Sequence, residues 1–388
     1  MSRIFSLALL FVFCGFALVP AGAGENTWDK IALDKTHIVS LISDPARPAT
    51  LYAVTPSGLQ KSLDSGANWN VIGQSLPLDM PASCVVVNPL NSKELYVGYD
   101  GQGIFKSSDS GGTWRSVNAG LPSLNVRCIV ISPKDTNLIY AGIMGGVAIS
   151  TSAGKSWHMA SGFKRAVNVN AIVIDPKNPQ YLYAGTGGAG VFKSGNGGVS
   201  WTDVNQGLSS LSILALHIDP ENPDIVLAGA YHPATPSDFY VGVANGGVFQ
   251  TLDGGRTWKE TSLLTVTIFS FASDPLYPDL VYTGAWGGAY RSLDKGTTWV
   301  DLNTGLDNAF MHTMYLKPTK PPLLLAGTTF GLLSYTDKDL EKLQPQKGGE
   351  TPFVWYAAAG VGAALLIVSF CFWRKRRRAA RNPERSVW

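Results

Sequence analysis

Between Trp28 and Tyr335, short apolar runs alternate with clusters of glycine, proline and acidic residues. In one representative stretch the apolar runs are VNAIVID, YLYAG, VFKS and SWTDV, and the separators are DPKNP, TGGAG and GNGG. Short apolar runs bounded by turn residues are typical of β-strands. Proline falls only in the separators, where a missing N–H group is tolerated. The pattern predicts four short antiparallel strands, here named A to D in chain order, joined by tight turns.

The four-strand pattern recurs along the chain with a regular period. An apolar run that ends in an x-Pro turn occurs seven times, at intervals of 43 or 44 residues except for one of 55. The turn prolines are Pro45, Pro89, Pro133, Pro176, Pro220, Pro275 and Pro318. Seven units of this length are typical of a β-propeller, in which each unit forms one blade.

A second motif, Ser/Thr-x-Asp-x-Gly-x-Thr-Trp, follows strand C in most units, and KSSDSGGTW is one copy. Serine and aspartate oxygens can accept bonds from N–H groups of their own turn, glycine adopts a positive φ, and tryptophan packs beneath. A catalytic acid or phosphate loop is needed once, so repetition favours a structural turn. The acids or amides of the copies, followed by their tryptophans, are Asp64, Asp109, Asn196, Asp253, Asp294, Trp69, Trp114, Trp157, Trp201, Trp258 and Trp299.

The last unit lacks its own fourth strand. From Met311 the chain contains patterns for strands A to C only, whereas the N-terminal stretch NTWDKIAL has the pattern of a strand D and supplies Trp28. We expect this N-terminal strand to complete the last blade, because that closes the ring and removes an exposed sheet edge. The prediction is an all-β, seven-bladed β-propeller of four-stranded antiparallel blades over residues 25–336.

The ends of the chain differ from the repeats. Residues 1–24 contain Arg3, an apolar run and small residues, as a secretory signal peptide does. Residues 337–352 form a polar linker, and residues 353–373 are uncharged and long enough for one transmembrane helix. Residues 374–388 are basic, which places them in the cytoplasm. We therefore expect a single-pass cell-membrane protein whose propeller is periplasmic or extracellular.

Charge and cysteine content narrow the possibilities. The formal net charge of +3 belongs to the C-terminal tail, which has seven Lys or Arg residues and one Glu, so the propeller itself is slightly acidic. Nucleic-acid binding has no electrostatic support. Cys84 and Cys128 occupy a strand-A position, five residues before the turn proline, that is small in every unit. We expect them to be free thiols, with a bridge between neighbouring blades as the alternative.

The Ser/Thr-x-Asp-x-Gly-x-Thr-Trp turn is identified as an Asp-box, or BNR repeat. Together with DPKNPQYLYAGTGGAGVFKS it resembles the repeats of BNR-type photosystem II assembly factors and of two-propeller xyloglucanases. Sialidases and sortilin-type receptors share the box, but the sialidase tripeptide Arg-Ile-Pro, a second propeller and a cysteine-rich module are absent here. The resemblance implies the propeller fold and, through the assembly factors, a binding platform rather than an enzyme.

Strand alternation places the A–B and C–D turns on one face of the ring, the turn face, and the B–C and D–A connections on the other, the loop face. The turn face is regular, whereas the loop face varies and carries the fifth unit's extra residues, Tyr231–Ala244. Exposed aromatic and polar residues there suit a protein or glycan partner. The candidate binding residues are Tyr99, Asp100, Gln102, Arg127, Tyr231, His232, Asp238, Tyr240 and Trp286.

A glycan hydrolase is the alternative. Asp100 and Asp238 would then be the paired carboxylates, which glycosidases hold within about 5–10 Å of each other. These two residues come from units two and five, and nothing in the sequence brings them together. His232 and His312 lack a spacing that commits them to a metal, so we predict no metal and no cofactor.

Overall fold

The computed structural model describes residues 26–341 except 78–79, 81, 164–166, 233–245, 275–276, 307–308 and 318. The predicted signal peptide, transmembrane helix and basic tail lie outside these residues. Within the described ranges, no helix is long and apolar enough to cross a membrane.

The described chain forms seven four-stranded antiparallel sheets, as the repeat period predicts. Blades 1 to 3 are β2 (Ser40–Asp44), β3 (Arg47–Thr55), β4 (Gly58–Ser62), β5 (Asn70–Ile72); β6 (Ala82–Asn88), β7 (Asn91–Tyr99), β8 (Gly103–Ser107), β9 (Arg115–Ser116); and β10 (Val126–Ile131), β11 (Ile139–Ile143), β12 (Gly146–Ser150), β13 (His158–Met159). Blades 4 and 5 are β14 (Val169–Ile174), β15 (Leu182–Thr186), β16 (Gly190–Ser194), β17 (Thr202–Asp203); and β18 (Ile213–Ile218), β19 (Val226–Ala230), β20 (Gly247–Thr251), β21 (Lys259–Leu264). Blades 6 and 7 are β22 (Ile268–Asp274), β23 (Tyr277–Ala285), β24 (Gly288–Ser292), β25 (Val300–Asp301); and β26 (Met311–Lys317), β27 (Leu323–Thr328), β28 (Gly331–Thr336), with β1 (Trp28–Ala32) as the fourth strand of blade 7.

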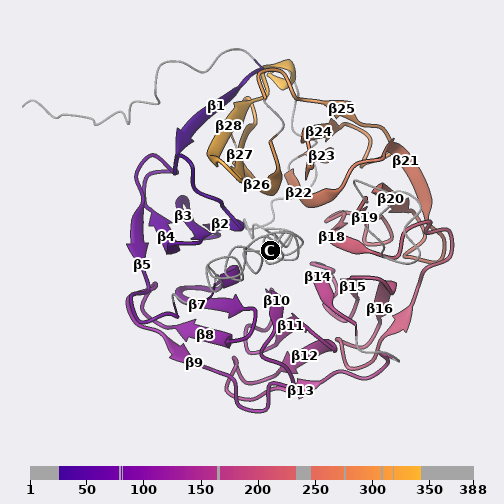
Figure 1. Cartoon of the computed structure of the whole chain (residues 1–388). Helices are drawn as coiled ribbons and strands as arrows, with labels where there is room; N and C mark the ends of the chain where they lie inside the picture. Colours follow the sequence, from indigo (N-terminus) through magenta and orange to yellow (C-terminus); the bar gives the residue numbers. More distant parts are fainter. Residues whose placement is uncertain are drawn as a thin grey trace, which may run out of the picture.

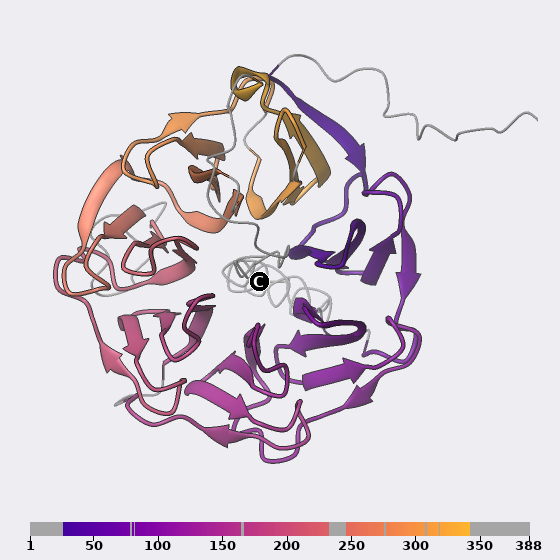
Figure 2. The same ribbon diagram turned by 180° about the vertical axis from the view of Figure 1, so that it is seen from behind.

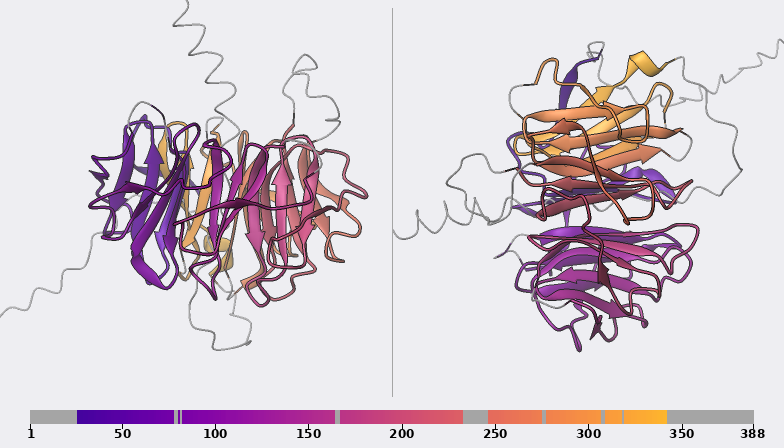
Figure 3. Two further views of the ribbon diagram at one scale, coloured as in Figure 1. Left: turned by 90° about the horizontal axis from the view of Figure 1, so that it is seen from below. Right: turned by 90° about the vertical axis from the view of Figure 1, so that its right-hand side faces the viewer.

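The blades stand around a central axis, with each strand A innermost and each strand D at the periphery (Figures 1 and 2). Seen from the side, the ring is a disc whose strands run between its two faces (Figure 3). The N-terminal strand closes the ring, as predicted. β1 pairs antiparallel with β28, and Trp28 lies opposite Tyr335.

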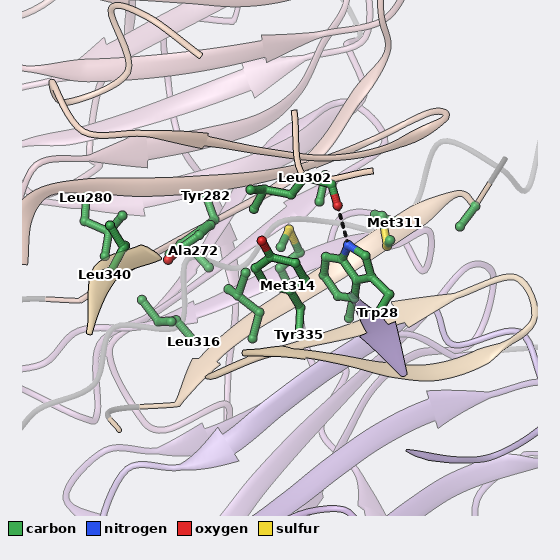
Figure 4. Packing of buried hydrophobic residues seen from close by; sticks show 14 residues of the cluster. Trp28, Ala272, Leu280, Tyr282, Leu302, Met311, Met314, Leu316, Tyr335 and Leu340 are labelled. Carbon is green, nitrogen blue, oxygen red and sulfur yellow. Dashed lines mark hydrogen bonds between the residues drawn. The ribbon is translucent and has the colours of Figure 1, made fainter. Parts of the chain in front are cut away.

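The core lies between neighbouring blades, where apolar side chains of adjoining sheets pack face to face. At the closure, Trp28 is 7% exposed, and its ring centroid lies 5.1 Å from that of Tyr335. Its indole N–H donates to the carbonyl of Leu302 in blade 6 at 2.8 Å. Figure 4 shows this tryptophan among residues of both blades, including Leu302 and Met311. The closing strand is therefore held by apolar packing as well as by its backbone pairing.

The C–D turns are held by their own side chains. In blade 2, Ser107 donates to Oδ1 of Asp109 at 2.8 Å, and the backbone N–H of Gly111 donates to the Ser107 hydroxyl at 2.9 Å. The N–H and hydroxyl of Thr113 donate to Asp109 at 2.8 and 2.7 Å. The Thr113 backbone bond is the main reason that the pKa of Asp109 falls to about 2. Both carboxylate oxygens are engaged in the turn, which suits a structural role.

The motif tryptophans bond in two ways. In blades 1, 2, 4 and 6 the indole N–H donates to the glycine carbonyl of the same turn; these are Trp69, Trp114, Trp201 and Trp299. In blades 3, 5 and 7 it donates to a carbonyl that follows strand D of the preceding blade; these are Trp157, Trp258 and Trp28. One residue type therefore fixes a turn in some blades and the contact between blades in others.

Two further expectations, about the cysteines and about the C-terminal boundary of the propeller, have different outcomes. Cys84 and Cys128 are free and buried, as predicted. The predicted start of the linker at Asp337 is wrong. Asp337 is fully buried, receives a bond from Tyr282 at 2.8 Å and pairs with Arg291 at 2.6 Å. The helical turn η1 (Lys338–Leu340) follows and buries Leu340, so the propeller extends to that residue.

We predict that Trp28→Ala destabilises the propeller by about 3–5 kcal/mol, because it leaves a cavity in the closing blade and an unpaired carbonyl at Leu302. Urea unfolding measures the change. Val71→Ala, on the solvent-exposed side of β5, is the control and should alter the free energy of unfolding by no more than about 0.5 kcal/mol. Equal unfolding midpoints for Trp28→Ala and the parent would show that closure does not depend on this side chain.

Candidate functional site on the loop face

Around much of the loop face the connections of neighbouring blades bond to one another. The B–C loop of one blade forms a β-bridge with the D–A connection that leads into the next. The bridged pairs are Asp100 with Asn125, Met144 with Asn168, Gly187 with Ser212, and Trp286 with Phe310. Between blades 7 and 1, the N–H of Ile38 donates to the carbonyl of Thr328 at 2.9 Å. Side chains from different blades are therefore held at fixed positions on one surface.

A β-bulge recurs near the loop-face end of the inner strands. Strands A of blades 2 to 7 each carry one extra residue relative to strand B. Bulges turn a side chain out of the regular alternation and are frequent beside functional sites. The extra residues are Ser83, Arg127, Asn170, Leu214, Phe269 and His312.

In blades 2 to 4 the bulge residues are polar and bond to neighbouring blades. The hydroxyl of Ser83 donates to the carbonyl of Val126 at 2.6 Å, and the amide of Asn170 donates to the carbonyl of Ile213 at 2.9 Å. Arg127 pairs with Asp100 at 3.2 Å, and their side chains remain 15% and 24% exposed. This part of the loop face presents an accessible ion pair, hereafter the Asp100–Arg127 pair.

In blades 6 and 7 the bulge residues are a phenylalanine and a histidine, and the segment that leads into blade 1 adds another ring. The ring centroid of His312 lies 5.4 Å from that of Phe269 and 4.5 Å from that of His37. Phe310 stacks against His312 at 6.1 Å and contacts Trp286 at 4.7 Å. We call these five residues the aromatic–histidine cluster. Figure 1 shows β22 and β26, which carry Phe269 and His312, and β2, which follows His37, as neighbours around the axis.

The histidines of this cluster are uncharged at neutral pH. Burial, and to a smaller extent the adjacent His37, lowers the pKa of His312 to about 3. Burial also lowers the pKa of His37. Nε2 of His312 bonds with the hydroxyl of Thr329 at 3.0 Å. Nδ1 of His312 and Nε2 of His37 have no hydrogen-bond partner within the described ranges. Buried polar atoms without partners are rare and often mark functional positions.

The predicted binding residues have different positions in the structure. Trp286 is 38% exposed and belongs to the aromatic–histidine cluster, and Asp100 and Arg127 form the ion pair. Tyr99 is 3% exposed and packs edge-on against Phe105 at 5.5 Å, so its interpretation as a surface aromatic is wrong. It is the last residue of β7, and strand alternation directs its side chain into the core between blades 1 and 2.

The remaining predicted residues lie on or near the fifth unit's insertion, apart from Gln102. The partly buried Gln102 lies in the blade 2 B–C loop, and its carbonyl accepts a bond from Asn118 at 3.0 Å. Tyr231 and His232 are also partly buried, and the ring Nδ1 of His232 accepts the N–H of Gly246 at 3.1 Å. Asp238 and Tyr240 lie outside the described residues.

Sequence reasoning did not assign Phe269, Phe310 or His37 to the site. The only available signal was positional. The bulge residue directly precedes the small residue that recurs in every strand A, such as Cys128 or Ser270. At this position, units two to four have serine, arginine and asparagine, whereas units five to seven have leucine, phenylalanine and histidine.

The geometry suits binding more than catalysis. Aromatic rings and charged residues on one surface are typical of protein-binding surfaces. The exposed apolar residues of this face include Trp286 and Phe330, at 38% and 53% exposure. Phe330 is the next residue after Thr329, whose hydroxyl bonds to His312 of the aromatic–histidine cluster.

Comparison with known proteins supports the fold. No protein-family model and no curated protein matches the chain. A structure of YCF48 bound to D1 peptide has a TM-score of 0.59 at 17% identity, with coverage of 81% of this chain and 98% of that one. The extracellular domain of the putative one component system BT4673 from B. thetaiotaomicron has a TM-score of 0.61 at 15% identity, with coverage of 80% of this chain and 40% of that one.

A third similar structure is an enzyme, the GH74 xyloglucanase from Xanthomonas campestris. Its TM-score is 0.51 at 16% identity, and the match covers 83% of this chain and 62% of the enzyme. The chain thus spans less than two thirds of the xyloglucanase and of the BT4673 domain. At these identities the likeness establishes the propeller fold alone.

We predict that the free energy of unfolding falls as the pH is lowered from 6.5 towards 4. The buried His217 and His312 have pKa values lowered to about 4 and about 3, so in this window the unfolded chain binds protons that the folded chain excludes. Each histidine contributes up to about 1.4 kcal/mol per pH unit. Urea unfolding at several pH values should show a shallower slope for His312→Phe.

The control for this series is His158→Gln, because His158 is exposed on β13. It should leave the pH slope of the parent unchanged. The carboxylates of the C–D turns lose their stabilising effect only at lower pH, since the pKa values of Asp64, Asp109 and Asp253 are lowered to about 2. A parent protein with constant stability between pH 6.5 and 4 would contradict the prediction.

Proposed function

We propose that this protein is a binding platform that holds a protein partner on its loop face. The observation that carries the proposal is that one face bears both the aromatic–histidine cluster, from blades 6, 7 and 1, and the partly exposed Asp100–Arg127 pair, from blades 2 and 3. Both are built on bulges of the inner strands and on loop-to-loop bridges, so their positions are fixed before a partner arrives. Pre-organised aromatic and charged anchors reduce the ordering cost of association.

The C–D turns support a structural rather than a catalytic reading of the repeat. Their resemblance to the Asp-box, or BNR repeat, is part of this proposal. In blades 1, 2, 5 and 6 the aspartate accepts bonds from the residue that precedes the tryptophan. In blade 4, Asn196 accepts the same backbone bond from Ser200 at 3.0 Å, without a carboxylate. The hydrogen-bonding pattern therefore requires an acceptor at this position, not an acid.

A protein partner is favoured over a glycan by the chemistry of the loop face and by one similar structure. Trp286, Phe330, Leu124 and Met144 are exposed apolar residues there, which suit peptide side chains. YCF48, which has a similar fold, has been solved bound to D1 peptide. A glycan partner, which the sequence also allows, would stack on Trp286 and is tested by the experiment below.

The proposal includes the location of the protein. Residues 1–24 have the features of a signal peptide, and the uncharged residues 353–373 followed by a basic tail have those of a membrane anchor. The propeller would then be attached to the cell membrane on its non-cytoplasmic side. The partner would be another extracytoplasmic or membrane protein.

A glycan hydrolase remains the second candidate, favoured by the similarity to the GH74 xyloglucanase fold. Asp100 would have to supply one of its two carboxylates, but an oxygen of that carboxylate contacts Arg127 at 3.2 Å. The hydrolase reading predicts turnover on a panel of oligosaccharides that is lost in Asp100→Asn. The binding reading predicts no turnover by the parent protein.

We predict that a photo-reactive benzophenone amino acid placed at Trp286 or Phe330 captures one discrete protein in intact cells. The reason is that these side chains are exposed on the loop face, at 38% and 53%. The same group at Val300, which is 58% exposed on the outer strand of blade 6, is the matched control and should capture little. Denaturing gels and mass spectrometry identify the adduct.

With the captured protein purified, Trp286→Ala should weaken its binding about tenfold or more, as loss of a central aromatic anchor does. Val300→Ala should leave the affinity unchanged. Equal capture from positions 286, 330 and 300, or full affinity in Trp286→Ala, would exclude the loop face as the binding surface. Saturable binding of an oligosaccharide at Trp286 would replace the protein partner by a glycan.

A further inference from the structure

The chain leaves the propeller at one fixed point on the turn face. β28 is strand C of blade 7 and ends at Thr336, beside the A–B turn, where the N–H of Asp337 donates to the carbonyl of Pro322 at 2.9 Å. Asp337 is buried and pairs with Arg291 of blade 6. The N–H of Lys338 then donates to the side chain of Asn26 at 3.1 Å. Contacts with two blades and with the N-terminal segment therefore determine where residues 342–388 begin.

Exposed leucines lie on the turn face on both sides of this exit point. Each C–D turn has a tip residue between its Ser or Thr and the residue at the aspartate position. In blades 5, 6 and 1 the tip is a leucine, and Leu252, Leu293 and Leu63 are 60%, 50% and 67% exposed. In blades 2, 3 and 4 the tip is Ser108, Thr151 and Gly195.

The leucine tips lie in the blades on either side of the exit. Blades 5 and 6 lie on one side of blade 7 and blade 1 lies on the other, whereas blades 2 to 4 complete the ring opposite (Figure 1). The turn hydrogen bonds do not require leucine, because Ser107 and Asp109 make the same bonds around Ser108. An exposed leucine at these three tips is therefore unexplained by folding.

The length of chain beyond the exit limits how the propeller can be oriented. Eleven residues, 342–352, separate the last described residue from the uncharged run 353–373. They reach about 40 Å when fully extended. If the turn face pointed away from an anchoring membrane, the chain would have to pass back along strands of up to nine residues, which is about 30 Å. The eleven residues can cover that path only when they are nearly fully extended, so a turn face directed at the membrane leaves the linker the most freedom.

We propose that the turn face of this propeller rests on the lipid bilayer, with Leu63, Leu252 and Leu293 in contact with its interface. This inference rests on the membrane anchoring included in the proposed function. Leucines on the surface of a membrane-bound domain enter the boundary between headgroups and acyl chains, at a depth of about 5–10 Å. The loop face then points away from the membrane, towards a soluble partner or the exposed part of a membrane protein.

The charges of the turn face set the depth of this contact. The carboxylates next to the leucine tips, Asp64, Asp253 and Asp294, stay in the hydrogen bonds of their own turns. Burying these charges in the hydrocarbon would be costly. The contact is therefore interfacial, with the leucines in the headgroup region and the carboxylates hydrated.

The test uses the full chain in phosphatidylcholine nanodiscs, with Cys14→Ser and Cys371→Ser to remove the thiols outside the described residues. Cys84 and Cys128 are buried and remain unlabelled. A solvent-sensitive fluorophore is attached to Leu63→Cys, Leu252→Cys or Leu293→Cys. The controls are Met144→Cys and Phe330→Cys on the loop face, which are 52% and 53% exposed in the parent. Because all five positions are exposed, the substitutions should not impair folding.

We expect a spin-labelled lipid to quench the three tip probes about threefold more strongly than the loop-face probes, because only the tips reach the interface. The emission of the tip probes should also shift to the blue. Equal quenching at the two faces would overturn the orientation, and stronger quenching on the loop face would reverse it. Tip probes that are protected but not quenched would show that a second copy of the chain covers the leucines, which also overturns the proposal.

The anchoring and the binding function are tested separately. A full chain that does not co-purify with nanodiscs would overturn the anchoring and with it this inference, but not partner capture at Trp286. Conversely, failure of capture at Trp286 leaves the quenching result intact. Leu63→Ser, Leu252→Ser and Leu293→Ser combined should leave partner binding in detergent unchanged.

Discussion

The pairing of β1 with β28 determines the rest of the molecule, because it joins the two ends of the repeat array into a ring. An open array would leave a sheet edge at each end, available for pairing with other chains. Closure also fixes where both ends of the described chain lie. Trp28 enters beside Tyr335, and Asn26 bonds to the segment that follows β28. The position of the exit, the identity of the turn face and the arrangement of blades 6, 7 and 1 all follow from this one pairing.

The repeats and the closing strand were predictable from the sequence because their determinants are local. A proline that ends strand A, or a serine two residues before an aspartate, specifies a turn through bonds within a few residues. The small residue of strand A at Cys84 and Cys128 was also visible as a recurring position. In the structure each thiol packs over a glycine of the neighbouring strand, Gly98 or Gly142, where an added Cβ would meet the sulfur at 2.8 or 2.5 Å. For these features, the structure adds only the order of the strands within each sheet.

The functional surface was less predictable, because it depends on register between strands. Tyr99 was expected on the surface, but strand alternation at the end of β7 buries it against Phe105. Arg127, Phe269 and His312 share one bulge position, yet a bulge is defined by the residue that the partner strand fails to oppose, which a single strand does not reveal. The burial of Asp337 could not be predicted either, because its partners Arg291 and Tyr282 come from another blade.

The two faces of the propeller illustrate how a repeat separates structure from function. On the turn face the same hydrogen bonds occur in blade after blade, so any residue that these bonds do not need stands out, as Leu63, Leu252 and Leu293 do beside Ser108. On the loop face the backbone bridges and bulges recur, and the side chains that they present differ from blade to blade. The same blade backbone presents polar side chains such as Ser83 and Asn170 on one part of this face. It presents rings such as Phe269 and His37 on another part. Because the scaffold is common to all blades, the differences between blades carry the information about partners.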